Sequence, residues 1–462
     1  MKRIVLLLIL MVSVFSTPAF ADGMAVSRRL DGLWGLHPEK QQVAAINFKD
    51  GFQNMLISID LDSEVRGEKA VWIFPVPASP EKVVIDIHKG FPRFAGEDID
   101  NIYKHSIWES ATVMGFYSTI PIIGPIIGAM LPLFMLGTAR GVNYEKGITI
   151  HESIQKLGVT TELITAKNQD ALAQYLQGKG LELPEKSKAI IGEYIGKDYS
   201  FVVSYISDLE EFRLESQTYR QNPTFDNEYY PYYESPIPIG VFVKFPTEKI
   251  YFPLKPTSVY ESAEIPITLF VVGHVSPNLS KETKPLSKTS YFMQNYYYGS
   301  TSDSAAFFNN QEIKRLDYTK IQITAPSKYF TEDLWIENSA PITVGLKGFI
   351  ATNIFWFGLA WFIALCIISS LIAGRLAFKK DPLLSDKKLA LHGLWNLLTI
   401  IGFGIATSQL KTKTLDPKIE AQLKEQNISV TVRDSRKFAY FFLFYVAFIA
   451  ITIISAWVLA LL

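Results

Sequence analysis

Residues 354–374 read IFWFGLAWFIALCIISSLIAG, and they lie within 27 uncharged residues between Lys347 and Arg375. A helix of about 20 apolar residues spans the hydrocarbon core of a bilayer, which is roughly 30 Å thick. Two further uncharged runs follow, at 389–410 and 438–462. We therefore predict three transmembrane helices, over residues 348–374, 389–410 and 438–462.

The distribution of Lys and Arg around the first predicted span indicates its orientation. Residues 375–388, which follow it, contain five basic side chains, whereas residues 328–347 contain two basic and three acidic ones. Because cytoplasmic loops are enriched in Lys and Arg, 375–388 is predicted to be cytoplasmic and the preceding chain extracytoplasmic. Residues 411–437 would then form an extracytoplasmic loop, although its seven basic side chains run against this trend.

The N-terminus has the pattern of a secretory signal peptide. Lys2 and Arg3 precede an apolar core, and residues 19–21 read AFA, a small-residue cleavage site. We predict that residues 1–21 are removed before Asp22, with an uncleaved anchor as the alternative. The predicted location is the bacterial cytoplasmic (inner) membrane, with several spans and a large N-terminal domain outside the cytoplasm.

The exported part of the chain has short segments in which apolar and polar residues alternate, as they do in strands. Residues 69–77, KAVWIFPVP, are an example in which Trp72 and Phe74 would share one face. The pattern predicts an α+β fold, mainly antiparallel, assembled from residues 22–109 and 140–275. Residues 276–347, rich in Tyr and Ser, are predicted to form a membrane-proximal region.

A two-helix insertion is expected within this domain. Asn168 is a typical N-cap residue at the start of the first helix. Pro184 suits the first turn of the second helix, which would bury Ala189, Ile190 and Tyr194.

Three motifs occur in order along the domain: W-x-x-P-V-P within residues 71–77, ALAQYL at 171–176 and FPTEKIYFPL at 245–254. In this order they resemble a family of exported bacterial proteins known only as a domain of unknown function. The resemblance covers roughly residues 40–275 and implies export and membrane anchoring. No activity is attached to that family, so no catalytic residue is carried over from it.

A second long apolar run, residues 110–139, interrupts the domain. It contains 30 residues without charge, and Gly124, Pro125 and Gly128 lie near its centre. Breaking at Gly124–Pro125 leaves two arms of about 21 Å each, too short to span a bilayer. We predict a re-entrant or membrane-docked hairpin, because both of its ends then stay on one side. Burial within the domain is the next alternative, followed by a true span.

Few patterns in the sequence indicate chemistry. Its six histidines are scattered and its single cysteine is Cys366, so neither a metal nor another cofactor is predicted. Ser153 and Lys156 match the S-x-x-K spacing of penicillin-binding enzymes without the companion motifs. Asp208, Glu210 and Glu211 are interpreted as a solvated turn rather than an acid/base pair. His392 and Asn396 would share a helix face, where we favour packing over an intramembrane site.

Aromatic residues supply the candidate binding surface. A Trp-Pro surface at Trp72 and the tyrosine tract Tyr229, Tyr230, Tyr232 and Tyr233 have flat faces suited to sugars, peptides or the lipid interface. The alternative is that these side chains pack over the core or end a strand.

The sequence predicts binding more readily than catalysis. We expect a non-catalytic binding or assembly subunit of a bacterial envelope system, with an envelope glycan or peptide hydrolase as the alternative and a transport-complex subunit as the second. The expected partners are the lipid bilayer and an envelope protein. Basic and acidic residues balance at 45 each, so no nucleic-acid partner is expected.

Overall fold

The computed structural model describes residues 24–28, 34–36, 42–58, 70–119, 153–179, 182–221, 239–294, 302–379, 381, 383–412, 416–426 and 434–462. The chain divides into two compact units. The α+β unit consists of residues 1–98 and 141–341, and the helical unit consists of residues 99–140 and 342–462. Most of the two predicted halves, 22–109 and 140–275, therefore belongs to one unit, whereas residues 99–109 belong to the helical unit.

The first sheet of the α+β unit has the strand order β2-β1-β5-β10-β9-β8, and its neighbouring strands are antiparallel. Its strands are β1 (Met24–Arg28), β2 (Trp34–Leu36), β5 (Ala70–Val76), β8 (Ser153–Lys156), β9 (Val159–Ile164) and β10 (Ser200–Ile206).

The second sheet has the order β6-β11-β4-β3-β13-β16-β15-β7, in which only the pairing of β3 with β13 is parallel. Its strands are β3 (Gln42–Lys49), β4 (Phe52–Ser58), β6 (Val84–Lys89), β7 (Glu97–Asp98), β11 (Ile239–Pro246), β13 (Glu264–Val272), β15 (Ser287–Gln294) and β16 (Leu316–Pro326). A small third sheet has the order β12-β17-β14, from β12 (Ile250–Phe252), β14 (Ser276–Pro277) and β17 (Leu334–Glu337).

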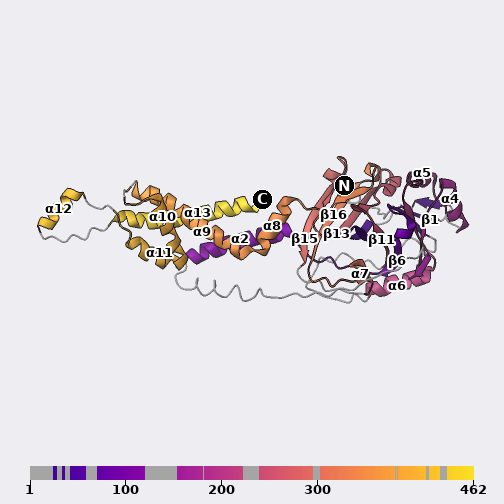
Figure 1. The fold of residues 1–462 in the computed structure, drawn as a ribbon, viewed down its shortest axis with the longest axis horizontal. Coiled ribbons are helices and arrows are strands. Elements are labelled where there is room, and N and C mark those ends of the chain that lie inside the picture. Colours follow the sequence, from indigo (N-terminus) through magenta and orange to yellow (C-terminus); the bar gives the residue numbers. More distant parts are fainter. Residues whose placement is uncertain are drawn as a thin grey trace, which may run out of the picture. The chain divides into compact units, whose positions relative to one another are not determined.

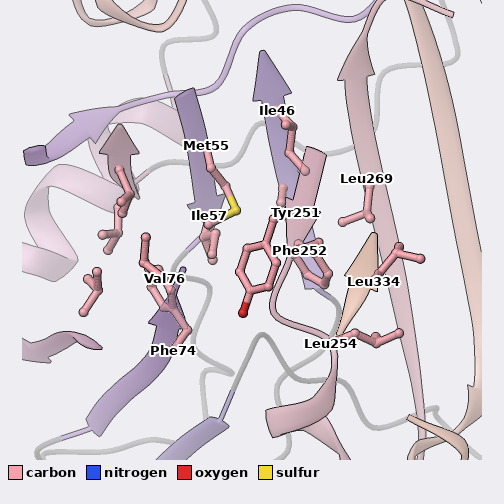
Figure 2. Close-up of a cluster of buried hydrophobic side chains, with 14 of the residues drawn as sticks. Ile46, Met55, Ile57, Phe74, Val76, Tyr251, Phe252, Leu254, Leu269 and Leu334 are labelled. Carbon is pink, nitrogen blue, oxygen red and sulfur yellow. The ribbon is translucent and has the colours of Figure 1, made fainter. Parts of the chain in front are cut away.

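Successive side chains of β5 point alternately into two different hydrophobic cores. Trp72 and Phe74 point into the main core, which the two large sheets share. Figure 2 shows this core, where Met55 and Ile57 of the second sheet lie near Phe74. Val71 packs on the opposite face, against helices α4 (Gln169–Gly178) and α5 (Glu185–Gly192). The shared face predicted for Trp72 and Phe74 is thus confirmed.

The two predicted helices are present as α4 and α5. The Asn168 side chain accepts a hydrogen bond of 2.8 Å from the backbone of Ala171, which confirms the predicted cap. In α5 the buried side chains are Ser187 and Ile191, whereas Ala189 is exposed. The buried face predicted for α5 is therefore wrong at Ala189, because the helix starts at Glu185 and its buried positions are spaced four residues apart.

The α+β unit continues past its predicted end at residue 275. Strands β14 to β17 lie in the range 276–337, and β15 and β16 are integral to the second sheet. The outer face of this sheet is covered by Phe307, at the end of α7 (Ser302–Phe307), whose carbonyl oxygen accepts 2.9 Å hydrogen bonds from Asn47 and Asn54. The sequence pattern did not indicate these strands. Their segment is rich in Tyr and Ser, because one face of each strand is only partly buried.

The helical unit contains α2 (Ile99–Thr119), α8 (Ile342–Thr352), α9 (Ile354–Phe378), α10 (Asp386–Gly393), η6 (Leu394–Leu398), α11 (Thr399–Ser408), α12 (Pro417–Glu425) and α13 (Ser435–Ala460). Within the described residues, α9 and α13 are the two helices long and apolar enough to cross a membrane. They lie side by side in Figure 1. They correspond to the first and third predicted spans.

Helix α2 crosses the predicted boundary between residues 109 and 110. It packs on α8, α9, α11 and α13, and the hydroxyl of Tyr103 donates a 2.8 Å hydrogen bond to the carbonyl oxygen of Leu459. The first ten residues of the predicted apolar hairpin therefore continue a helix that begins at Ile99. Residues 120–139, including Gly124, Pro125 and Gly128, lie outside the described residues, as does the predicted signal peptide.

The single helix predicted over residues 389–410 is instead divided into α10, η6 and α11. Gly393 packs so closely on α9 that a Cβ atom there would lie 2.4 Å from the carbonyl oxygen of Cys366. Gly402 and Gly404 follow within α11, and glycine is a weak helix former. Close packing and low helix propensity together favour the 3₁₀ break at η6.

The helical unit buries several polar side chains beside an apolar core and exposes many large apolar ones. Ser370, Asn396 and Tyr440 are fully buried, whereas Trp356 is 68% exposed and Phe438 is 76% exposed. Large exposed apolar surface is rare on soluble monomeric proteins and is found at protein or membrane contacts.

Candidate functional site

A buried polar cluster of the α+β unit is centred on the carboxylate of Asp333, in the loop before β17. It accepts hydrogen bonds from the Tyr194 hydroxyl at 2.9 and 3.0 Å and from the Tyr251 hydroxyl at 3.1 Å. The backbone N–H of Lys255 adds a bond of 3.1 Å. Four elements of the fold thus converge on one carboxylate: the end of α5, β12, the loop before β17 and η3 (Lys255–Tyr260).

Burial decides the electrostatics of this cluster. Burial raises the pKa of the Asp333 carboxyl above its ordinary value, and the hydrogen bonds from Lys255, Tyr194 and Tyr251 oppose the rise. Burial, followed by the negative charge of Asp333, raises the pKa of both tyrosine hydroxyls, so they stay protonated and remain donors. The cluster is therefore an ordered set of matched donors and acceptors.

One pocket adjoins this cluster and a second, larger pocket lies next to the first, and Trp335 on β17 lines both. The smaller pocket has a volume of about 220 Å³ and contains Tyr199 and Asp333 in its wall. The larger has a volume of about 640 Å³, within the range of small-molecule sites. Its wall comes from five chain segments: Gly51, then Pro77, Ala78, Ser79 and Lys82, then Asp198, then Pro246, Thr247, Glu248 and Lys249, then Trp335.

The W-x-x-P-V-P motif positions one wall of the larger pocket. Among the described residues, β5 pairs with β1 from Ala70 to Ile73. Pro75 pairs with Phe201 of β10, and proline cannot donate a hydrogen bond to a ladder. The chain then leaves the sheet at Pro77, and the hydroxyl of Ser200 holds the Ala78 carbonyl oxygen at 2.7 Å. The motif therefore forms one edge of the pocket, whereas the side chain of its Trp72 packs in the main core.

The chemistry of the larger pocket is suited to binding a ligand of mixed polarity. Trp335 and Pro77 offer apolar faces, and Lys82, Asp198 and Glu248 offer charges of both signs. Among the described residues, no group of three or more His, Cys, Asp or Glu is placed to hold a metal ion.

The candidate aromatic surface is only partly visible. Trp72 is 2% exposed and belongs to the main core, so its indole is not accessible to a partner. Tyr229, Tyr230, Tyr232 and Tyr233 lie outside the described residues.

Ser153 and Lys156 do not form a nucleophile and base pair. They lie on β8, where residues three apart point to opposite faces. The hydroxyl of Ser153 lies 3.3 Å from a Glu162 carboxylate oxygen, and the ammonium of Lys156 lies 3.8 Å from Asp86.

The acidic turn predicted at residues 208–211 is the start of a helix. The Asp208 carboxylate accepts a 2.9 Å hydrogen bond from the backbone N–H of Glu211. This bond lies at the N-terminal end of helix α6 (Leu209–Gln221). Acidic side chains at this position stabilise the helix N-terminus, and this is their physical role here.

His392 and Asn396 have partners inside the helical unit. His392 Nε2 lies 3.2 Å from Thr407 Oγ1, and the Asn396 carbonyl oxygen accepts a 2.6 Å hydrogen bond from the Tyr445 hydroxyl. The Asn396 amide lies 3.6 Å from the sulfur of Cys366. Asn396 thus packs between helices, as favoured in the sequence interpretation.

Sequence reasoning did not single out Asp333 or Trp335. One of their neighbours, Tyr251, lies in FPTEKIYFPL, a motif that carried the family resemblance, and another, Tyr194, was predicted to be buried with the second helix. Both residues contribute to the Asp333 cluster, and this was the available signal.

Comparisons with known proteins give one family match. No curated protein matches the chain. A structure of baculovirus P35 matches with 10% identity and a TM-score of 0.25, over 65% of this chain and 96% of that chain. A structure of a mutated P35 after caspase cleavage matches with 9% identity and a TM-score of 0.23, over 65% of this chain and 99% of that chain. These scores support no argument about fold or function. Residues 37–210 match the model of a bacterial family described as "Uncharacterized protein conserved in bacteria (DUF2330)", which includes β5 and α5.

Proposed function

We propose that this chain is a multi-pass protein of the bacterial cytoplasmic membrane, with its α+β unit outside the cytoplasm. The observation that carries this proposal is the surface of the helical unit, on which many large apolar side chains are exposed while polar side chains such as Ser370 and Asn396 are buried. A bilayer is the environment in which that arrangement is stable, since lipid tails accept apolar surface and buried polar groups bind one another.

We further propose that the α+β unit acts as a non-catalytic binding or assembly subunit of an envelope system. The larger pocket supports this role, because its wall combines the Trp335 ring with charges of both signs. Its wall is assembled from five separate chain segments of the folded unit, which favours a site that is already shaped before binding. No geometry around Ser153 favours the hydrolase alternative.

Extraction of membranes with alkaline carbonate tests the anchoring. Full-length protein should remain in the membrane pellet, because a helix that spans the bilayer is not released when peripheral contacts are disrupted. Quantitative release into the supernatant would overturn the membrane proposal.

Site-specific photo-crosslinking in living cells tests the binding role. A photoreactive residue at Lys82 or Glu248, on the larger pocket, should give a discrete cross-linked species. The same residue at Glu264, an exposed strand position outside the pocket, serves as the control. Absence of a species specific to the pocket positions would overturn this assignment.

A further inference from the structure

The segment formed by α10, η6 and α11 enters and leaves the helical unit at the same end. Its first half runs antiparallel to α9. Arg375 Nη2 lies 2.6 Å from Asp386 Oδ2 at the end of α9, the hydroxyl of Ser370 donates to the carbonyl oxygen of Leu389 further in, and Asn396 reaches Cys366 deeper still.

The second half returns along α13. Asn396 bonds to Tyr445, the Phe403 ring stacks on Phe444 at 4.1 Å, and the ammonium of Lys437 donates to the carbonyl oxygen of Ser408 at 2.9 Å. The contacts on α13 therefore move from residue 445 back to residue 437 as the segment proceeds. This order places the end of α11 beside the start of α13.

An ion-pair cluster closes this end of the unit. The guanidinium of Arg436 lies 3.3 Å from the carboxylate of Asp381, which follows α9, and 2.8 Å from that of Asp434, which precedes α13. Thr412, which follows α11, donates a 2.7 Å hydrogen bond to Asp434. The ends of α9 and α11 and the start of α13 are thus held together.

The depth of the segment is about half a membrane. Nine residues of α9 separate Arg375 from Cys366, and eight residues of α13 separate Lys437 from Tyr445. At 1.5 Å per residue these lengths are about 12 to 14 Å, against a hydrocarbon thickness of roughly 30 Å. Asn396, at the tip, therefore lies near the middle of the bilayer in the proposed membrane setting.

We propose that residues 386–408 form a re-entrant hairpin, and that the hairpin places the described parts of segments 375–388 and 411–437 on one side of the membrane, as a basic cytoplasmic surface that binds anionic lipid headgroups. The inference rests on the proposed membrane location. It places the C-terminus on the same side as the α+β unit, because α13 then crosses back. It also removes the conflict over the seven basic residues of 411–437, which lie on the cytoplasmic side with the other five.

The charge and position of this surface suit lipid headgroups. Segment 375–388 has five basic and two acidic side chains and segment 411–437 has seven and four, a net charge of +6 for both together. Lys387, Lys388 and Lys411 are exposed. The charges adjoin apolar surface, since Arg375 precedes Leu376, which is 59% exposed, and Lys437 precedes Phe438. Basic side chains that border an apolar band are typical of contact with anionic headgroups.

Cysteine accessibility in spheroplasts tests the topology. Full-length variants Lys281→Cys, Leu383→Cys, Glu425→Cys and Leu462→Cys are treated with a membrane-impermeant maleimide before and after permeabilisation. The unmodified chain is the blank, because Cys366 is fully buried. We expect labelling of positions 281 and 462 in intact spheroplasts, and of positions 383 and 425 only after permeabilisation.

The alternatives give different patterns. Three complete spans would expose position 425 outside and hide position 462, and this result would overturn the hairpin while leaving the membrane proposal intact. If position 281 were hidden or position 383 were exposed in intact spheroplasts, the proposed orientation itself would fail.

Reconstitution tests the lipid partner. Full-length protein is placed in phosphatidylcholine nanodiscs with an increasing fraction of phosphatidylglycerol, and its thermal unfolding midpoint is measured. We expect the anionic lipid to raise the midpoint, with a smaller rise at high salt because exposed charges are screened. The variant K387Q/K388Q/K411Q/K418Q should lose most of this rise.

A matched variant controls for the general effect of charge. Neutralising four exposed lysines of the α+β unit, K167Q/K281Q/K284Q/K288Q, changes the total charge by the same amount and should leave the lipid-dependent rise unchanged. An equal loss in both variants, or no dependence of the midpoint on phosphatidylglycerol, would overturn the proposed lipid contact.

Discussion

His392 Nε2 lies 3.2 Å from Thr407 Oγ1, although fifteen residues separate them in the chain. In one straight helix that separation would correspond to a rise of roughly 22 Å. The contact therefore requires the chain to fold back between α10 and α11. This single pair distinguishes a hairpin from the continuous span predicted by apolar run length.

A double-mutant cycle measures this contact. His392→Ala and Thr407→Ala should each lower the stability of the full-length protein in detergent, and the double variant should lose less than the sum, because both remove the same interaction. Side-chain hydrogen bonds in helical membrane proteins couple by about 0.6 kcal/mol on average. Thermal unfolding of the four proteins provides the measurement, and strict additivity would contradict the hairpin contact.

The close approach of Gly393 to α9 predicts a large effect from one methyl group. Gly393→Ala should destabilise the protein by about 1–3 kcal/mol, because its Cβ would overlap the carbonyl oxygen of Cys366. The readout is again the thermal unfolding midpoint in detergent.

Gly345 in α8 provides the control for this substitution. A Cβ there would have no atom within 4 Å, so Gly345→Ala should be neutral or stabilising by up to about 1 kcal/mol through helix propensity. The expected effects thus have opposite signs, and equal effects at the two glycines would argue against the packing of α10 on α9.

Arg436 is expected to be essential for the closed end of the helical unit. Arg436→Gln leaves the carboxylates of Asp381 and Asp434 without their guanidinium, and their side chains are 1% and 6% exposed. Stranding buried charges in this way destabilises a protein by on the order of 3 kcal/mol. The lower thermal unfolding midpoint of Arg436→Gln should be accompanied by faster proteolysis near residues 379–385.

The Arg375–Asp386 pair offers a comparison at the same end of the unit. Both side chains are more than half exposed, so Arg375→Gln should leave the midpoint nearly unchanged. Comparable losses from the two substitutions would show that burial does not decide the contribution of Arg436.

The Asp333 cluster predicts a dependence of stability on pH. The folded pKa of Asp333 is raised, so the folded state binds its proton more tightly than the unfolded state does. Stability relative to Asp333→Asn should therefore increase as pH falls from neutral toward the unfolded value of about 3.9, and it should level off below that value. Unfolding midpoints of both proteins across this range provide the test.

Tyr194→Phe tests the cause of this dependence. It removes a hydroxyl that donates to the Asp333 carboxylate and that opposes the rise in its pKa. The dependence on pH should then become steeper than in the unmodified protein. A flatter profile would indicate that the hydroxyl does not stabilise the ionised carboxylate.

Local patterns predicted much of the fold. Alternation identified β5 and the shared face of Trp72 and Phe74, and capping chemistry identified the start of α4 at Asn168. These features depend on residues close together in the chain. The strands β15 and β16 were missed, because their pattern is half polar and their pairing with β13 comes from across the sheet.

The candidate site could not be predicted in the same way. Asp333 receives hydrogen bonds from Tyr194, 139 residues earlier, and from Tyr251, 82 residues earlier. No local pattern relates these positions, and Trp335 lines the two pockets only because β17 pairs with β12.

By itself the sequence determined the α+β class, the apolar character of α9 and α13, and the local helix and strand signals, because composition and periodicity act over a few residues. Only the tertiary structure decided that 389–410 is not one helix. The length of an apolar run reflects only the absence of charged residues. The path of the chain depends instead on the close packing of Gly393 on Cys366 and on the bond between His392 and Thr407. Those contacts join residues that are distant in the chain, so only packing reveals them.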